Sequence, residues 1–132
     1  VLDHAIKELA RVFVAKTLDC GYCAGQRSHL SGLSEREFDE VIEFRESTVL
    51  SDREKAALLL AEAIAWDPLM AGDEVWAKLH EHFTEPEIVE LGYFIGLTMG
   101  QQKFLKTLGI KHGELEAPDA AGLAPDVAAT LR

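Results

Sequence analysis

The two cysteines of this chain form a Cys20-Gly-Tyr-Cys23 motif, and it lies where one helical pattern stops and another begins. Two thiols at this spacing can cycle between a dithiol and a disulfide. The start of a helix presents unpaired N–H groups and a partial positive charge, which favour the thiolate over the thiol. The motif therefore predicts activated sulfur, although zinc sites and chance also produce a C-x-x-C.

Glu8 is the second residue that could take part in chemistry. It is the only charged residue on a helix face that otherwise carries Val1, Ala5, Val12 and Ala15. A carboxylate within an apolar stripe either reaches out to solvent or is held in place for a purpose. The residues alone leave both interpretations open.

The elements that position these side chains are predicted to be helices throughout. The first helix has Asp3 as its N-cap, and a later one begins at Asp73. Three others begin with a capping box, in which Ser34, Ser51 or Thr84 is followed three residues later by a glutamate. No segment alternates apolar and polar residues as a half-buried strand would. The predicted fold class is all-α, with about six helices and the C-x-x-C at the start of the second.

Two of the predicted helices carry signals about packing. Residues 56–66 are apolar nearly all round, so this helix should be central in the domain. The last long helix has Gly92, Gly96 and Gly100 on one face. Because an interior glycine costs about 1 kcal/mol relative to alanine, a compensating close helix contact is expected. Packing within the chain is the first interpretation and a contact with another subunit the second.

Composition and charge limit the partners. The 132-residue chain has a net charge of -10, which argues against binding to nucleic acid or to an anionic membrane surface. The longest apolar stretch, 88–99, contains Glu90 and is shorter than the roughly 20 residues that span a bilayer. Residues 1–112 are predicted to form one helical domain. Residues 113–132, rich in alanine, proline and aspartate, are predicted to form a C-terminal arm.

Cysteine usage bears on the compartment. Two cysteines are too few for a disulfide scaffold, and the sequence has no recognisable signal peptide. We therefore expect a cytoplasmic protein, in whose reducing environment a C-x-x-C is redox-active rather than structural. A chain that starts at Val1, inside a helical pattern, does not exclude a targeting segment that has been removed.

The order of these features resembles the carboxymuconolactone decarboxylase/alkylhydroperoxidase D (AhpD-like) superfamily. Glu8, the C-x-x-C motif twelve residues later, the glycine turn at 32–34 and the segment 79–91 match that family in order and spacing, over roughly residues 3–110. The resemblance implies an all-helical domain that assembles into trimers or hexamers. Its C-x-x-C members reduce peroxides or disulfides through paired thiols, without a further cofactor, and are restored by an external dithiol or a redox protein.

Site roles also follow from the resemblance. It implies that Cys23 is the attacking thiolate, that Cys20 resolves the oxidised product, and that Glu8 ends a proton relay. The family has a histidine four residues after the second cysteine, where this chain has Arg27. On a continued helix Arg27 would share a face with Cys23 and stabilise a thiolate, but guanidinium cannot shuttle protons. His29 could replace the missing histidine only if that helix ends early.

Three functions are thus open, and thiol-dependent oxidoreduction of a peroxide or a disulfide leads. The second is a structural or metal-binding module, with Cys20, Cys23 and His29 as three of four zinc ligands. The third is a carboxymuconolactone decarboxylase-type lyase, which rests on the superfamily name alone. His80 and His82 border an apolar face, so packing is their first interpretation and a proton-transfer role near the thiols the second. Tyr22 either gates access to Cys23 or packs.

Overall fold

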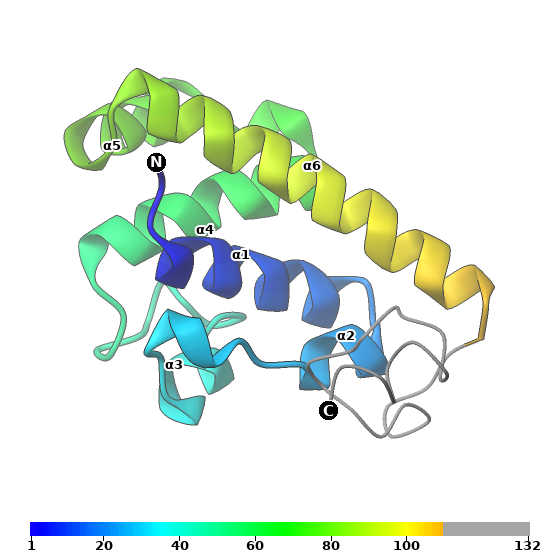
Figure 1. Ribbon diagram of the computed structural model, residues 1–132. Coiled ribbons are helices and arrows are strands. Elements are labelled where there is room, and N and C mark those ends of the chain that lie inside the picture. Colours follow the sequence, from blue (N-terminus) through cyan, green and yellow to red (C-terminus); the bar gives the residue numbers. More distant parts are fainter. Residues whose placement is uncertain (110–132) are drawn as a thin grey trace.

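A computed structural model describes residues 1–109 of the chain, and these form helices with no strand (Figure 1). The prediction of an all-α fold with about six helices is confirmed. The arm predicted for 113–132 lies outside the described residues. The elements are the α-helices α1 (His4–Thr17), α2 (Gly21–Gly25), α3 (Glu35–Asp39), α4 (Asp52–Ala65), α5 (Asp73–His82) and α6 (Glu85–Thr107), with two 3-10 helices, η1 (His29–Ser31) and η2 (Pro68–Met70).

The helix starts follow from local chemistry. The Asp3 carboxylate accepts the N–H of Ile6 at 3.0 Å and caps α1. The predicted capping boxes at Ser34, Ser51 and Thr84 are all present. In each, the side-chain oxygen and the N3 glutamate satisfy N–H groups that the first turn leaves unpaired. None of the helices in residues 1–109 is long and apolar enough to cross a membrane.

The core is organised around α4, which contacts α1, α5 and α6. Figure 1 shows α4 running behind α1 and α6, as the apolar composition of this segment predicted. Its Leu58 and Ala61 are fully buried. Phe13 of α1 packs edge to face against Phe44, with ring centroids 6.1 Å apart. This contact packs the segment that follows α3 against α1. The central place predicted for this helix is confirmed.

The glycine face of α6 does not pack within the described part of the chain. A Cβ added at Gly92, Gly96 or Gly100 would meet nothing within 4 Å. The first interpretation of this stripe, a close helix contact inside the chain, is therefore wrong for residues 1–109. The face is bordered instead by exposed apolar side chains, among them Tyr93 at 81% and Leu97 at 72% exposure.

The turn between α1 and α2 positions the cysteines. Asp19 adopts a φ of 54°, a left-handed conformation that aspartate tolerates better than most residues. The chain then folds back, so that the Cys20 N–H donates to the Ala15 carbonyl at 2.9 Å. The far end of α6 ties this turn down, because Lys106 Nζ donates to the Leu18 carbonyl at 2.7 Å. The cysteine motif is thus fixed against α1 and α6 together.

Candidate functional site

The two cysteines stand at the start of α2, as predicted. Cys20 is the N-cap residue, and its Sγ accepts the Cys23 N–H at 3.4 Å. The sulfurs are joined as a disulfide, with Cα atoms 5.3 Å apart. Both residues are buried, at 4% and 5% exposure, in a small cluster with Ala15 and Tyr22. The structure therefore holds the oxidised form of the C-x-x-C pair.

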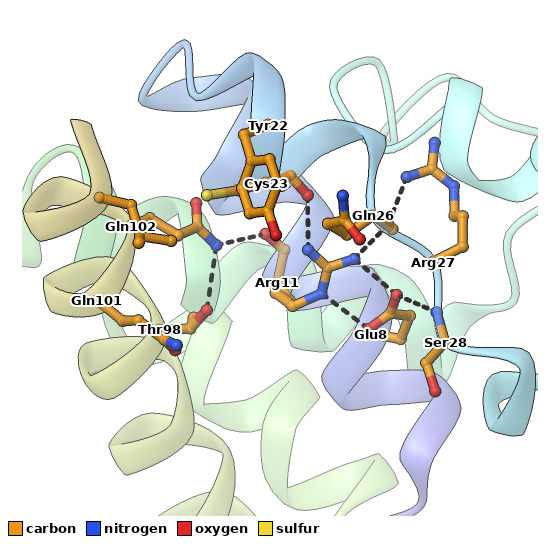
Figure 2. A pocket seen from close by; sticks show the side chains of 11 residues that line it. Glu8, Arg11, Tyr22, Cys23, Gln26, Arg27, Ser28, Thr98, Gln101 and Gln102 are labelled. Carbon is orange, nitrogen blue, oxygen red and sulfur yellow. Dashed lines mark hydrogen bonds and ion pairs between the residues drawn. The ribbon is translucent and has the colours of Figure 1, made fainter. Parts of the chain in front are cut away.

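A cavity of about 230 Å³ opens beside Cys23 but is not lined by Cys20 (Figure 2). Its walls come from α1, α2, the segment that follows α2, and α6. The lining residues are Glu8, Arg11, Tyr22, Cys23, Gln26, Arg27, Ser28, Thr98, Gln101, Gln102 and Leu105. Cys23 is thus the sulfur that a small molecule entering this cavity would meet first.

Glu8 lies in the wall of this cavity as the buried half of an ion pair with the partly buried Arg11. Glu8 is 4% exposed, and Arg11 donates two hydrogen bonds to its carboxylate, from Nε at 2.8 Å and from Nη2 at 2.6 Å. The Ser28 N–H adds a third at 3.0 Å. Burial alone raises the pKa of Glu8, but the bonds and charge of Arg11, with the Ser28 amide, outweigh it and lower the pKa from its ordinary value. Of the two interpretations of Glu8, the residue held in place is the one observed.

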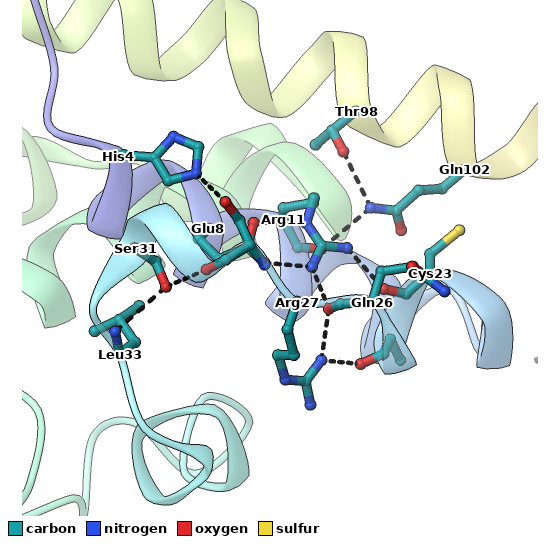
Figure 3. A network of polar contacts seen from close by, with 12 residues as sticks. His4, Glu8, Arg11, Cys23, Gln26, Arg27, Ser31, Leu33, Thr98 and Gln102 are labelled. Carbon is teal, nitrogen blue, oxygen red and sulfur yellow. Dashed lines mark hydrogen bonds and ion pairs between the residues drawn. The ribbon is translucent and has the colours of Figure 1, made fainter. Parts of the chain in front are cut away.

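Arg11 is the central member of the polar network, and the sequence analysis did not identify it. Besides Glu8, it binds the carbonyl of Cys23 through Nη1 at 2.7 Å and that of Gln26 through Nη2 at 2.6 Å (Figure 3). These carbonyls lie at the end of α2, where a helix leaves C=O groups unpaired. Arg11 therefore joins the acid of α1 to the helix of the cysteines. The available signal was its position three residues after Glu8, on the same helix face.

Arg27 does not share a helical face with Cys23, because α2 ends at Gly25 and Gln26 is extended. Its guanidinium forms an ion pair with Glu35 at 2.9 Å and lies 4.5 Å from the centre of the Phe38 ring. It also donates to the carbonyls of Ala24 and Gln26. Arg27 lines the cavity, but its charge is shared with Glu35.

The early end of α2 meets the condition set for His29, yet His29 lies in η1, is exposed and does not line the cavity. The histidine near Glu8 is His4, whose Nε2 is 2.7 Å from Ser28 Oγ (Figure 3). The sequence analysis gave His4 no role. His80 and His82 belong to α5 and are also absent from the cavity wall.

The inner face of α6 completes the site with two buried polar residues, Thr98 and Gln102, at 4% and 3% exposure. Gln102 Nε2 donates to the Arg11 carbonyl and to Thr98 Oγ1, both at 3.1 Å. Within residues 1–109, three buried polar atoms of the cavity-lining residues have no hydrogen-bond partner: Tyr22 OH, Gln26 Oε1 and Gln102 Oε1. The same residues contain no group of three His, Cys, Asp or Glu side chains that could hold a metal ion.

Comparison with known proteins gives a consistent assignment. Residues 1–63 match the model of the carboxymuconolactone decarboxylase family. The uncharacterized protein Rv2313c of Mycobacterium tuberculosis is 33% identical over 97 residues, which are 71% of this chain and 34% of that protein. The uncharacterized protein YnjA of Escherichia coli is 28% identical over 113 residues, 83% of this chain and 62% of that one. The chain thus spans about a third of the length of the mycobacterial relative.

A crystal structure shows the same fold. ATU0492 of Agrobacterium tumefaciens, a protein of unknown function provisionally assigned to antioxidant defence as AhpD, superimposes with a TM-score of 0.77 at 25% sequence identity. The match covers 84% of this chain and 79% of that one. By its fold and its site, this chain is an all-helical domain with a C-x-x-C at the start of its second helix. The chain is thus similar to the carboxymuconolactone decarboxylase family over residues 1–63, and its described fold is similar to that of a protein provisionally assigned as AhpD.

Proposed function

We propose that the protein is a thiol-dependent oxidoreductase that reduces a peroxide or a disulfide with Cys23 and Cys20. The observation that carries the proposal is the position of Cys23 in a cavity wall, already bonded to Cys20. Similarity to the carboxymuconolactone decarboxylase family, and to a structural neighbour provisionally assigned to antioxidant defence, supports the same class of chemistry. The proposed setting is the reducing cytoplasm, where an external dithiol or a redox protein is available as reductant.

In the proposed cycle the two thiols are the groups of the protein that are oxidised and reduced. The Cys23 thiolate attacks a peroxide oxygen, so that an S–O bond forms, the O–O bond breaks, and the leaving alkoxide takes a proton from water. Cys20 then attacks the sulfenic sulfur, an S–S bond forms, and hydroxide leaves with the Cys20 proton as water. With a disulfide substrate, the Cys23 thiolate breaks the substrate S–S bond, forms a mixed disulfide and releases the first thiol. Cys20 then attacks Cys23 Sγ, the Cys20–Cys23 bond forms, and the second thiol leaves. An external dithiol is oxidised as it restores the pair.

The bond from the Cys23 N–H to Cys20 Sγ supports this division of labour. When an external thiolate attacks Cys23, Cys20 departs as the leaving group, and a leaving thiolate is expelled faster if its charge is stabilised. An N-cap position provides such stabilisation. Cys20 is thus suited to leave and to resolve, and Cys23 to meet the substrate.

Glu8 and Arg11 enter the proposal as positioning residues. Three donors occupy the Glu8 carboxylate, and its lowered pKa makes it a weak base. Through Arg11 it fixes the carbonyls of Cys23 and Gln26, and hence the orientation of the cysteine helix. The relay role that the resemblance implies for Glu8 stays a prediction, as do the roles of Arg27 and His29.

The proposal is tested by counting free thiols in reduced protein mixed with one equivalent of tert-butyl hydroperoxide or dithiodipyridine. We expect the wild type to lose both thiols at neutral pH to at least one reagent. With the hydroperoxide, Cys20→Ser should stop at a sulfenic acid that dimedone traps, and Cys23→Ser should not react. Two thiols that survive both reagents would refute the proposal. Full lyase activity in a Cys20→Ser/Cys23→Ser protein would favour the decarboxylase alternative, whose chemistry has no use for the pair.

We further propose that the protein works as a homo-oligomer that uses the outer face of α6. This face carries the open glycines and the exposed Val89, Tyr93 and Leu97, and residues 91–102 contain no charged side chain. In a chain with a net charge of -10, such an uncharged apolar strip is the surface on which two copies would repel each other least.

A further inference from the structure

We infer that Gln102 and Tyr22 form a polar cradle for the two oxygens of a hydroperoxide at Cys23, which makes the site selective for hydroperoxides over disulfides. Gln102 would accept the hydrogen bond of the O–H group, and Tyr22 would donate one to the oxygen that leaves. This inference rests on the proposed thiol chemistry and goes beyond it, because the C-x-x-C alone serves either substrate class.

The orientation of the Gln102 amide is fixed by its neighbours. Its Nε2 lies 3.1 Å from the Arg11 carbonyl oxygen, which can only accept, so the nitrogen must be on that side. The second N–H points to Thr98 Oγ1. Both donors of the amide are thus used inside the protein, while Oε1 remains buried without a partner. In Figures 2 and 3 the Cys23 sulfur points to the side of the site on which Gln102 lies.

Tyr22 supplies the complementary group. Its side chain is 3% exposed, it lines the same cavity, and its hydroxyl has no partner among the described residues. Burial raises the pKa of Tyr22, so the phenol keeps its proton at neutral pH and remains a donor. A buried donor and a buried acceptor left unpaired each cost free energy, which a ligand that satisfies both would recover.

A hydroperoxide, ROOH, fits this pair and a disulfide does not. The terminal O–H is a donor for Gln102 Oε1, and the oxygen bonded to carbon is an acceptor for Tyr22 OH. A disulfide has no O–H or N–H at its reacting atoms, so Gln102 Oε1 would stay unpaired beside it. A site that leaves a buried polar group unsatisfied rejects the analogue that lacks the matching group. The cavity of about 230 Å³ leaves room for a compact R group.

The Cys23 thiolate attacks the terminal oxygen, which keeps its hydrogen and becomes the hydroxyl of the sulfenic acid. The O–O electron pair goes to the other oxygen, which is hydrogen-bonded to Tyr22 and becomes the alcohol by taking a proton from water. Gln102 therefore orients the oxygen that is transferred, and Tyr22 stabilises the charge that develops on the leaving group.

The test compares two reagents in single turnover with fully reduced protein. Tert-butyl hydroperoxide carries the O–H group, whereas dithiodipyridine lacks it and reports the reactivity of the thiolate alone. We expect Gln102→Met and Tyr22→Phe each to lower the hydroperoxide rate constant about tenfold, since each removes one buried hydrogen bond to the reacting atoms. The dithiodipyridine rate constant should fall by less than about twofold in both variants, and an increase in Gln102→Met is consistent with removal of the acceptor that a disulfide leaves unpaired. Lys103→Met, beside Gln102 on α6 but exposed and outside the cavity wall, is the control and should change neither rate.

The outcomes separate this inference from the proposed function. Equal losses with both reagents would mean that the two side chains act on the thiolate or its packing, and no loss with either would mean that they do nothing. Both results overturn the inference. A wild-type protein oxidised by dithiodipyridine but not by hydroperoxide also overturns it, while thiol–disulfide chemistry stands. Failure with both reagents overturns the proposed function itself.

Discussion

At the level of single residues, the buried Glu8–Arg11 pair has the most consequences for the site. Two charges are costly to bury unless their remaining hydrogen-bonding groups are satisfied. Here Arg11 also binds two carbonyls, and Glu8 also binds the Ser28 amide. Removing Arg11 would leave the Glu8 carboxylate buried without its cation, whereas removing the Glu8 charge would leave the partly buried Arg11 with its two carbonyls alone. The pair is therefore a rigid support under the cysteine helix.

The lowered pKa of Glu8 makes stability depend on pH. The folded-state pKa lies below the ordinary value of 4.5, so ionised Glu8 stabilises the fold above that pH. The contribution is lost as pH falls through the folded-state pKa. We expect Glu8→Gln to lower the free energy of unfolding at pH 7 by about 1–3 kcal/mol. Its unfolding free energy should also decline less than that of the wild type between pH 5 and the acid limit of folding, as measured by urea titration at each pH.

Glu35→Gln is the matched control for this measurement. Glu35 also pairs with an arginine, Arg27, but its side chain is 67% exposed. Exposed pairs contribute about 0–1 kcal/mol because solvent screens them. If both variants lose the same stability with the same pH dependence, the Glu8–Arg11 pair contributes no more to stability than the exposed Arg27–Glu35 pair.

At the level of elements, α2 depends on contacts from outside itself. It has five residues, too few for a stable isolated helix. Cys20 caps its start, and Arg11 binds carbonyls at its end. The conformation of the cysteine motif is therefore maintained by α1.

Arg11→Met should loosen α2 without displacing α1. The Ala24 N–H, which donates to the Cys20 carbonyl at 2.8 Å, is the reporter. We expect its hydrogen exchange to accelerate about tenfold more than that of amides in the middle of α4, which report the loss of global stability; the difference corresponds to about 1.4 kcal/mol of local stability. Arg27→Met, which removes an arginine paired with an exposed acid, should have a smaller effect at Ala24. Equal acceleration at Ala24 and in α4 would mean that Arg11 affects only global stability.

The elements were largely predictable from sequence, because their signals are local. Capping boxes at Ser34, Ser51 and Thr84 involve residues three apart, and each marks a real helix start. The early end of α2 was left open by the sequence, although glycine, here Gly25, is common at helix ends. Only the continued helix would have put Arg27 on the face of Cys23. The site was less predictable, because Gln102 and Arg11 are 91 residues apart and only packing brings them together.

At the level of the whole molecule, the outer face of α6 is an apolar surface that the described chain leaves uncovered. Because Gly96 has open space around it, a larger residue there should not disturb a monomer and should favour the helix. The same substitution would obstruct a second copy packed closely on this face. A larger residue at Gly96 should thus stabilise the monomer but weaken the association of copies, so the two effects can be told apart.

We expect Gly96→Gln to reduce the mass measured by sedimentation while its helix content and thermal midpoint stay equal to or above those of the wild type. Glu74→Gln, an exposed change on α5, should leave the mass unchanged. A wild-type protein that is monomeric at tens of micromolar would contradict the oligomer. An unchanged mass in Gly96→Gln would show that another surface is used.

One helix, α6, contributes Thr98 and Gln102 to the wall of the cavity beside Cys23, while its glycines lie on the outer face. Its Lys106 binds the turn that precedes the cysteines. A partner that rotates or shifts α6 would therefore also move the side chains around the Cys23 sulfur. If two copies associate along α6, self-association and ligand binding in the cavity are coupled. Association then changes the affinity for the ligand by the same factor as the ligand changes the affinity between copies.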